Sequence, residues 1–190
     1  GMAPQEALEA AISLWTPELT RRRRWRALPQ LVAPRWAGFD ADFSLRDNRL
    51  IAERLHSAFG GLQLERLVTP LRVVATEAAT GRRVVLTSGP LTDALLASMA
   101  VPFIFPSVEI GGRRLVDGVV SDPLPVGVAG DAQVVLALGF EGALPRRPTS
   151  AQRLAAQATT AMINNLMQAR LAAARAAGQR IVALNLALEQ

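Results

Sequence analysis

The sequence predicts an α/β fold with a partly parallel sheet, and three observations support this class. Short runs rich in Val and Leu, typical of strands, alternate along the chain with longer segments of helical periodicity. The run VVLALGF, which begins at Val134, is continuously apolar, as expected of a strand covered on both faces. No repeat or low-complexity linker divides the 190 residues, and a single domain accommodates that length. We therefore expect one domain over residues 1–190.

Two helices are predicted in the first third of the chain. Residues 4–15 have an amphipathic pattern. Asp47 or Asn48 can cap a second helix over residues 49–59, which ends at a Gly-Gly pair. The only histidine, His56, lies in this second helix. No catalytic partner accompanies it in the sequence, so we interpret His56 as a partly buried helical residue.

Two β-hairpins, with a helix between them, are predicted in the middle of the chain. The first hairpin covers residues 71–89, where two Val-rich runs flank a Thr-Gly pair. The second joins VEI to RRLV through Gly111 and Gly112, because glycine permits the positive φ angles of a tight turn. The helix starts near Pro90 and ends before Pro102, since proline fits the first turn of a helix and cannot continue one.

The last third of the chain is predicted to form a strand, a long helix and a final strand. The strand is VVLALGF, and the Ala-rich helix runs from about Ser150 to Gly178. The final strand is IVALNLAL, which begins at Ile181. Strands separated by helices indicate that part of the sheet is parallel, because parallel strands need crossover connections.

Composition excludes several kinds of chemistry. The chain has no cysteine, which removes disulfides, thiolate nucleophiles and zinc–thiolate sites. All 21 basic residues are arginine, so lysine Schiff bases and lysine general bases are excluded. With one histidine and no tyrosine, catalysis would rest on carboxylates, hydroxyls, arginine and backbone amides. We predict no cofactor and no metal.

The formal net charge is +5, and the densest basic run is RRRRWR at residues 21–26. We predict no nucleic-acid binding, because neither lysine nor a nucleic-acid-binding motif accompanies this run. Arginine together with tryptophan suits a membrane surface, and a solvated helix face is the other interpretation. No apolar run is long enough to span a bilayer, and the N-terminus lacks a signal-peptide pattern. We expect a cytoplasmic protein, with membrane association as the alternative.

Three stretches occur in a characteristic order and spacing: ATEAATGRRVVLTSGPL, then ALLASMAVPFIFPSVEIGGRRLVDG, then SDPLPVGVAGDAQVVLALGF. Together they resemble the C-terminal two-thirds of the catalytic domain of bacterial patatin-like phospholipases. The resemblance covers most of residues 45–188 and is strongest over residues 71–140. It implies a three-layer α/β/α fold and a lipid acyl hydrolase with a Ser-Asp dyad, acting on lipid or acyl-ester substrates.

The resemblance assigns the dyad aspartate to Asp117 and the glycine after it to Gly118. On turn patterns alone, Asp-Gly between two apolar runs predicts a hairpin turn. The two interpretations are compatible, because a carboxylate in a turn can orient a serine hydroxyl and take its proton without histidine. We expect the Asp117 carboxylate to face a cleft, and Gly118 to have a positive φ or another strained geometry.

Two residues depart from the family pattern near this motif. Val119 stands where the pattern has Gly or Ala, and its β-branched side chain adds bulk beside the turn. Asp122 stands before Pro123, where the pattern usually has Asn. If Asp122 lies close to Asp117, the second anion would raise the pKa of the less solvated carboxyl group.

The nucleophile motif of the family is absent from this sequence. None of the eight serines has a glycine two positions before it, as the Gly-x-Ser-x-Gly elbow requires. The glycine-rich oxyanion loop is also missing, and we expect Ser98, near the end of its helix, to be structural. The resemblance therefore implies a portion of an acyl hydrolase that lacks the N-terminal part of the fold and retains the dyad Asp without the Ser. The alternative is a non-catalytic relative that binds lipid or a protein partner.

Association with a second copy is also expected. In the family, strands that precede the equivalent of residue 2 lie in the middle of the sheet. Without them, VVLAL or a neighbouring strand would expose apolar side chains and unpaired amides to water. We therefore expect a homodimer that buries this surface.

Overall fold

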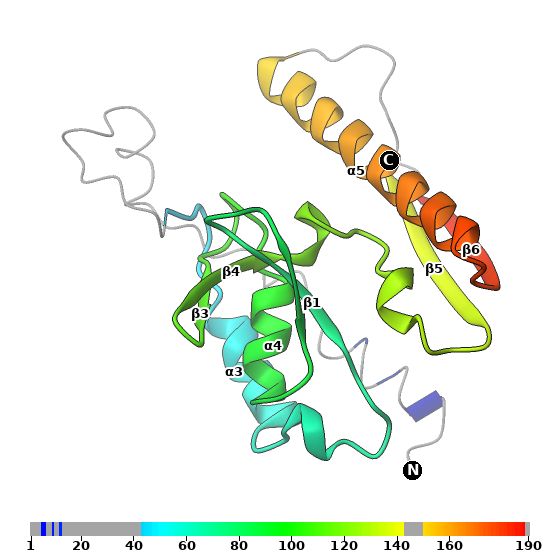
Figure 1. The fold of residues 1–190 in the computed structure, drawn as a ribbon. Helices are drawn as coiled ribbons and strands as arrows, with labels where there is room; N and C mark the ends of the chain where they lie inside the picture. The colour runs from blue at the N-terminus through cyan, green and yellow to red at the C-terminus, as the bar shows by residue number, and fades with distance from the viewer. Residues whose placement is uncertain (1–4, 7–8, 10–11, 13–42, 143–149, 189–190) are drawn as a thin grey trace.

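The computed structural model describes residues 5, 6, 9, 12, 43–142 and 150–188. All of the basic run at 21–26, and most of the helix predicted over residues 4–15, lie outside these described residues, although Gln5, Glu6, Glu9 and Ile12 are helical. The elements in chain order (Figure 1) are α3 (Arg49–Phe59), the 3-10 helix η2 (Leu64–Arg66), β1 (Val73–Glu77), β2 (Arg83–Leu86), α4 (Leu91–Ser98), β3 (Val108–Ile110), β4 (Arg113–Asp117), the 3-10 helices η3 (Gly118–Val120) and η4 (Val126–Ala129), β5 (Val135–Gly142), α5 (Ala151–Ala176) and β6 (Ile181–Leu188). This mixture of helices and strands confirms the α/β class.

The first four strands form an antiparallel sheet in the order β2-β1-β4-β3. Its two hairpins, β1–β2 and β3–β4, are the two that the sequence predicts. Gly81 lies in the first turn with φ 68°, and Gly111 and Gly112 form the second with φ 59° and 72°. Residues with a Cβ rarely adopt these angles, so the glycines determine where the chain reverses.

Helix α4 packs against β1 and β4, and α3 packs against α4 (Figure 1). The core between α4 and the sheet includes Ala75, Ala97 and Leu115, none of which is exposed to solvent. Helix α3 begins after Asn48, and the Oδ1 atom of Asp47 accepts a hydrogen bond from the Arg49 N–H at 2.8 Å.

His56 lies on α3 as predicted, but its side chain is exposed. The expectation of partial burial is therefore wrong. The buried face of α3 is formed by Ile51 and Leu55, which pack towards α4, and His56 lies beside that face rather than on it.

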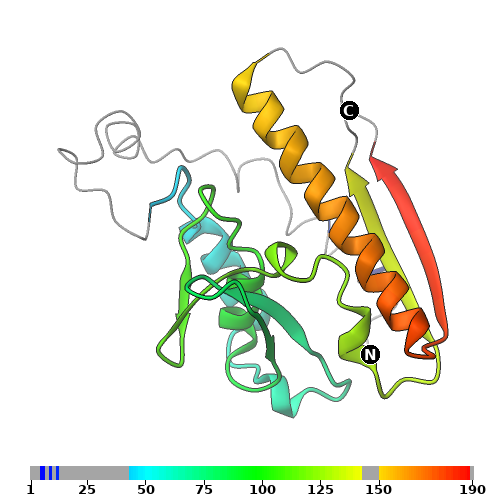
Figure 2. The same cartoon turned by 45° about the horizontal axis from the view of Figure 1, so that its top comes forward.

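The C-terminal elements form a strand–helix–strand unit. β5 and β6 pair in parallel, in a register that runs from Val135 opposite Ile181 to Gly142 opposite Leu188. Helix α5 provides the crossover and lies along one face of the two strands (Figure 2). At its N-terminus the Ser150 hydroxyl accepts a hydrogen bond from the Arg153 N–H at 3.2 Å.

Among the described residues, the strand VVLALGF is covered on one face only, which corrects the expectation of burial on both. Along β5 the residues alternate between buried and exposed, because α5 packs on a single side. Leu136, Leu138 and Phe140 are each more than half exposed, and Val182 and Leu184 of β6 are about equally so. The parallel pairing belongs to this separate two-stranded sheet, not to the four-stranded one.

Candidate active site around Asp117

Asp117 is the last residue of β4, and its backbone is held by two hydrogen bonds and by its place in the sheet. It lies opposite Ala75 of β1 in the antiparallel ladder. Its N–H donates to the carbonyl oxygen of Ala100 at 2.9 Å, and its carbonyl oxygen accepts from the Thr76 hydroxyl at 2.8 Å. The position of Asp117 is therefore determined by β1 and by the segment that follows α4.

The Asp117 side chain caps the 3-10 helix η3. Its Oδ1 atom accepts a hydrogen bond from the Val119 N–H at 2.8 Å, with backbone angles φ −47° and ψ 137°. The Asp-Gly pair is therefore not a hairpin turn, and that interpretation is wrong. The strand β4 ends at Asp117 and passes directly into η3, whereas the hairpin turn of β4 lies at Gly111 and Gly112.

Burial raises the pKa of the Asp117 carboxyl group above its usual value, and the Val119 N–H partly opposes this effect. Desolvation disfavours the charged form of a carboxyl group. Among the described residues, no other donor bonds to the carboxylate. Within the described part of the chain, the second oxygen, Oδ2, therefore accepts no hydrogen bond.

Gly118 does not have the positive φ that the sequence suggests. It is buried against β1, where a Cβ atom would overlap the carbonyl oxygen of Val74 and lie 3.3 Å from the Val74 Cγ1 atom. Glycine is needed here because two backbone segments approach closely. The need for glycine is thus explained by contact with β1 and not by the turn angle.

Asp122 is buried, with only 1% of its side chain exposed, and pairs with two arginines from different elements. Its Oδ2 atom lies 2.5 Å from the Arg83 Nη1 atom of β2, and its Oδ1 atom lies 3.6 Å from the Arg170 Nε atom of α5. Arg170 also donates to the carbonyl oxygen of Ser121 at 2.9 Å. The raised pKa of Asp117 has burial as its cause, and Asp122 is not among the groups that contribute to it.

No serine of the described residues hydrogen-bonds to the Asp117 carboxylate. Ser121 is buried, and its hydroxyl shares a 2.7 Å hydrogen bond with the Thr76 hydroxyl. Ser98 is the final residue of α4, as expected for a structural residue near the end of its helix. Among the described residues, the Asp117 carboxylate therefore has no serine hydroxyl bonded to it.

An apolar groove of about 300 Å³ lies next to this turn. Val116 and Val120, on either side of Asp117 in the sequence, contribute to its wall, although Asp117 itself is not among the lining residues. The other lining residues are Phe43, Thr76, Glu77, Ala78, Gly81, Pro102, Phe103, Phe105 and Ser107. Sequence reasoning did not identify this groove; the aromatic residues between Pro102 and Pro106 were the available signal.

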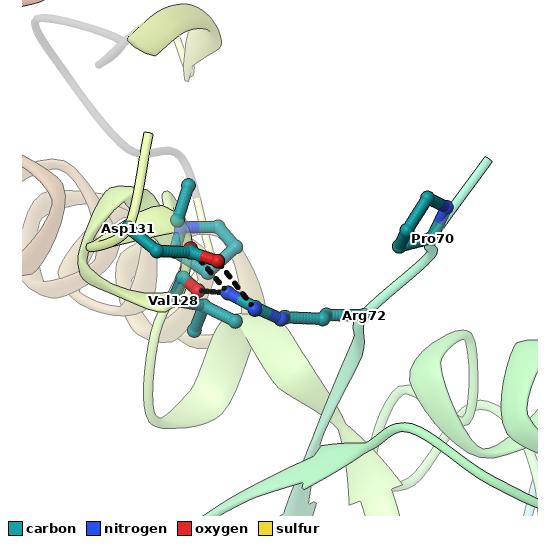
Figure 3. A pocket seen from close by; sticks show the side chains of 6 residues that line it. Pro70, Arg72, Val128 and Asp131 are labelled. Atoms are coloured by element: carbon teal, nitrogen blue, oxygen red, sulfur yellow. Dashed lines mark hydrogen bonds and ion pairs between the residues drawn. The ribbon is translucent and has the colours of Figure 1, made fainter. Parts of the chain in front are cut away.

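A second cavity, of about 360 Å³, is lined by Pro70, Arg72, Pro125, Val128, Ala129 and Asp131 (Figure 3). Arg72 forms a bidentate ion pair with Asp131, with nitrogen–oxygen distances of 2.9 and 3.0 Å, and also donates to the carbonyl oxygen of Val128 (Figure 3). Both charges are compensated. In this cavity the ion pair therefore joins the start of β1 to the segment after η4, and it leaves neither charge to bind an ion.

Neither a metal cluster nor a membrane-spanning helix occurs in the described part of the chain. No group of three or more His, Asp or Glu side chains there is placed to hold a metal ion. None of the described helices has the length and apolarity needed to cross a bilayer.

Comparison with known proteins identifies the family to which this chain belongs. The model of the patatin-like phospholipase family matches residues 1–129, which include the antiparallel sheet and Asp117. Uncharacterized NTE family proteins from Mycobacterium bovis and from two strains of Mycobacterium tuberculosis are each 32% identical over 137 residues. Each match covers 70% of this chain but only 36% of the relative. The chain therefore belongs to the patatin-like phospholipase family.

Proposed function

We propose that this chain carries the carboxylate half of the active site of a patatin-like serine lipid acyl hydrolase, with Asp117 as the base of a Ser-Asp dyad. The observation that carries the proposal is a carboxylate at the end of a strand, held by the Val119 N–H and with a pKa raised by burial. The apolar groove is lined by its neighbours Val116 and Val120 and not by Asp117 itself. A raised pKa brings a carboxylate closer to the operating pH, which strengthens it as a general base.

The reaction would proceed in two steps, with a serine contributed from outside the described residues. Asp117 accepts the proton of the serine hydroxyl as the oxygen attacks the acyl carbonyl carbon. The proton then passes to the departing alcohol, leaving an acyl-enzyme. Water attacks this ester and gives a proton to Asp117. The bond between the acyl carbon and the serine oxygen then breaks, the fatty acid leaves, and Asp117 returns the proton to the serine oxygen.

The geometry of the turn supports this role. Oδ1 is held by the Val119 N–H, which fixes the orientation of the carboxylate and leaves Oδ2 for the serine hydroxyl. Gly118 allows η3 to pack directly on β1, so the carboxylate rests on a rigid strand. Positioning of this kind lowers the entropic cost of bringing the reacting groups together.

We further propose that the described elements belong to one partial domain. The ion pair of Arg72 with Asp131 connects β1 to the segment after η4, and Asp122 connects to β2 through Arg83 and to α5 through Arg170. These contacts join the antiparallel sheet to the β5–α5–β6 unit. The apolar lining of the groove supports a lipid as the substrate.

The alternative function is a non-catalytic module that binds lipid or a protein partner. It is favoured by one observation: none of the described serine hydroxyls bonds to the Asp117 carboxylate. Under this alternative the groove would bind its ligand without chemistry.

The coding DNA upstream of Met2 separates the two functions. An in-frame Gly-x-Ser-x-Gly segment supports the hydrolase, and a stop codon supports the binding module. If the segment is present, the longer protein should be expressed as wild type, Asp117→Asn and Asp93→Asn. Asp93 is a half-buried aspartate on α4 and serves as the matched control.

Asp117→Asn should lower kcat for p-nitrophenyl ester hydrolysis by about 10²–10⁴-fold, because a general base typically contributes that factor. Asp93→Asn should retain the wild-type rate. Full activity in Asp117→Asn would disprove the assignment of the base.

A further inference from the structure

A single hydroxyl group of β1 contacts both ends of the turn that carries the proposed base. This turn consists of η3 with Asp117 before it and Ser121 after it. The Oγ1 atom of Thr76 lies 2.8 Å from the carbonyl oxygen of Asp117 and 2.7 Å from the Oγ atom of Ser121. Both ends of η3 are therefore bonded to the same atom of the neighbouring strand.

The chemistry of the three groups determines the direction of these hydrogen bonds. A carbonyl oxygen can only accept, so Thr76 donates its single hydroxyl proton to Asp117. Thr76 then has no proton left for Ser121, and the Ser121 hydroxyl is the donor to the Thr76 oxygen. The bonds run from Ser121 through Thr76 to the Asp117 carbonyl oxygen, and bonds in such a chain strengthen one another.

Burial makes these bonds costly to lose. Thr76 is 1% exposed and Ser121 is 8% exposed, so water cannot readily replace a missing partner. A buried polar group that loses its hydrogen bond destabilises the folded state. Valine has the shape of threonine without the hydroxyl, and β1 already contains Val73 and Val74. What threonine adds at position 76 is therefore the hydroxyl group.

Ser121 is also held by contacts that do not involve Thr76. Its N–H donates to the carbonyl oxygen of Gly118 at 3.1 Å, and its own carbonyl oxygen accepts from the Arg170 Nη2 atom of α5 at 2.9 Å. The Ser121 hydroxyl therefore reaches Thr76 from a backbone that is already fixed at the far end of η3.

The Asp117 carboxylate depends on this arrangement because its own hydrogen bond comes from the middle of η3. The Val119 N–H donates to Oδ1 at 2.8 Å. Since both ends of η3 are bonded to Thr76, the Val119 N–H has a fixed direction relative to β1. The carboxylate that accepts from it has a fixed direction as well.

We propose that Thr76 is a positioning residue for the Asp117 carboxylate, acting through η3 with Ser121 as its second contact. Among the described residues, Thr76 does not bond to the carboxylate itself, which accepts only from the Val119 N–H. The catalytic consequence rests on the proposed function, in which Asp117 is the base. The positioning can be measured in the 190-residue chain without any reaction.

The first test is amide hydrogen exchange, followed by NMR in the 190-residue chain. Thr76→Val removes the hydroxyl and keeps the shape of the side chain. The Val119 N–H should then exchange about tenfold faster relative to the amides of the β1–β2 ladder, because η3 opens locally more easily. The ladder amides report any loss of overall stability, so a merely structural role would leave this ratio unchanged.

Three further variants complete this test. Thr76→Ser keeps a hydroxyl and should retain the wild-type exchange ratio. Thr92→Val makes the same substitution at another buried threonine, on α4, which has no hydrogen bond to η3 within the described residues, and it should also retain the ratio. Ser121→Ala removes only the bond at the far end of η3 and should raise the ratio severalfold, even if Thr76→Val does not fold.

The second test uses the longer protein that carries the serine. Thr76→Val should lower kcat for p-nitrophenyl ester hydrolysis about tenfold per folded active site, because the base is less well oriented. KM should stay unchanged, since valine preserves the part of the groove wall that Thr76 forms. Thr76→Ser should restore kcat, and Thr92→Val should not lower it.

Two results would overturn the proposal. One is a wild-type exchange ratio in both Thr76→Val and Ser121→Ala. The other is an equal rise of the ratio in Thr76→Ser, which would assign the effect to the methyl group of Thr76 and not to its hydroxyl. Full activity in Asp117→Asn would disprove the proposed function alone, because the exchange ratio of the Val119 N–H does not depend on hydrolysis.

Discussion

At the residue scale, the proposed role of Asp117 requires a charged carboxylate in a place where burial disfavours the charge. Its carboxylate caps η3 and is desolvated by the surrounding structure, which raises its pKa. Folding therefore favours the protonated form of this residue. Its contribution to stability is fully present below the pKa of the unfolded chain and is lost as the pH rises through the raised pKa of the folded state.

Asp117→Asn should therefore raise the melting temperature at neutral pH, because it removes a desolvated charge. Asparagine retains an oxygen that can accept from the Val119 N–H, so the cap is preserved. Thermal unfolding should be followed at neutral pH and at a pH below 3.8, the ordinary pKa of an aspartate. The increase in melting temperature should disappear at the acidic pH, because the Asp117 carboxyl group is then protonated in the wild type as well. A loss of stability at neutral pH would contradict the assigned cause of the shift.

Gly118 provides a second prediction at this scale. Gly118→Ala should destabilise the protein by about 1–3 kcal/mol, because the added Cβ would overlap the Val74 carbonyl oxygen and force the backbone to move. Gly127→Ala is the matched control, since a Cβ there meets no atom within 4 Å. Urea unfolding of both variants is the measurement. Equal stability in the two would show that η3 can move away from β1 at little cost.

At the element scale, Asp122 connects the turn after η3 to two elements that are distant in sequence. Arg83 comes from β2 and Arg170 from α5. Where the family pattern usually has Asn, this chain has a buried Asp whose negative charge is compensated by these arginines. A buried charge is tolerated only when it is paired.

Removing one arginine should therefore lower the stability of the protein more than neutralising the charge of Asp122. Arg83→Met should destabilise the protein by about 2–3 kcal/mol, a figure reduced from the fully buried case because the Arg83 side chain is 36% exposed. Asp122→Asn should lower the free energy of unfolding by less. The double variant Arg83→Met/Asp122→Asn should recover part of the stability that Arg83→Met loses. Denaturant unfolding of the four proteins gives the coupling energy. Additive effects would exclude an interaction between the two side chains.

At the scale of the whole molecule, the β5–β6 pair has one face that nothing covers in the described structure. The exposed residues of this face carry no charge: Val134, Leu136, Leu138, Phe140, Val182 and Leu184. Parallel strands are normally covered on both faces. Since each chain has a net charge of +5, an uncharged face is also where two copies can meet with the least repulsion.

The 190-residue chain should therefore self-associate, most simply as a two-fold dimer through this face. Six side chains about half exposed present on the order of 600 Å² per copy, near the lower end for specific interfaces. Light scattering at micromolar concentration should give about twice the monomer mass of 20.3 kDa. Leu138→Glu should return the chain to a monomer. A wild-type mass of 20.3 kDa would show that this face does not mediate self-association.

The sequence by itself determined the features that depend on neighbouring residues. Both hairpins follow from Gly81 and from the pair Gly111 and Gly112, which adopt angles that other residues rarely accept. The bounds of α5 follow from Ser150, whose hydroxyl caps the first turn, and from Gly178 after the last. Asp117 was assigned as the dyad aspartate from a local motif, and the range of the family match covers its position; the assignment stays a prediction.

The tertiary structure decided what depends on contacts between distant segments. Asp122 is paired with an arginine 39 positions away, and no local pattern indicates such a partner. The reason for glycine at position 118 lies in β1, and the positive φ of Phe103 occurs where its carbonyl oxygen accepts a hydrogen bond from the distant Leu45 N–H. The apolar run of β5 predicted two covered faces, but its composition cannot show how many neighbouring elements will pack on it. Burial, charge compensation and strain are properties of the assembled chain, because each arises only when segments far apart in sequence are brought into contact.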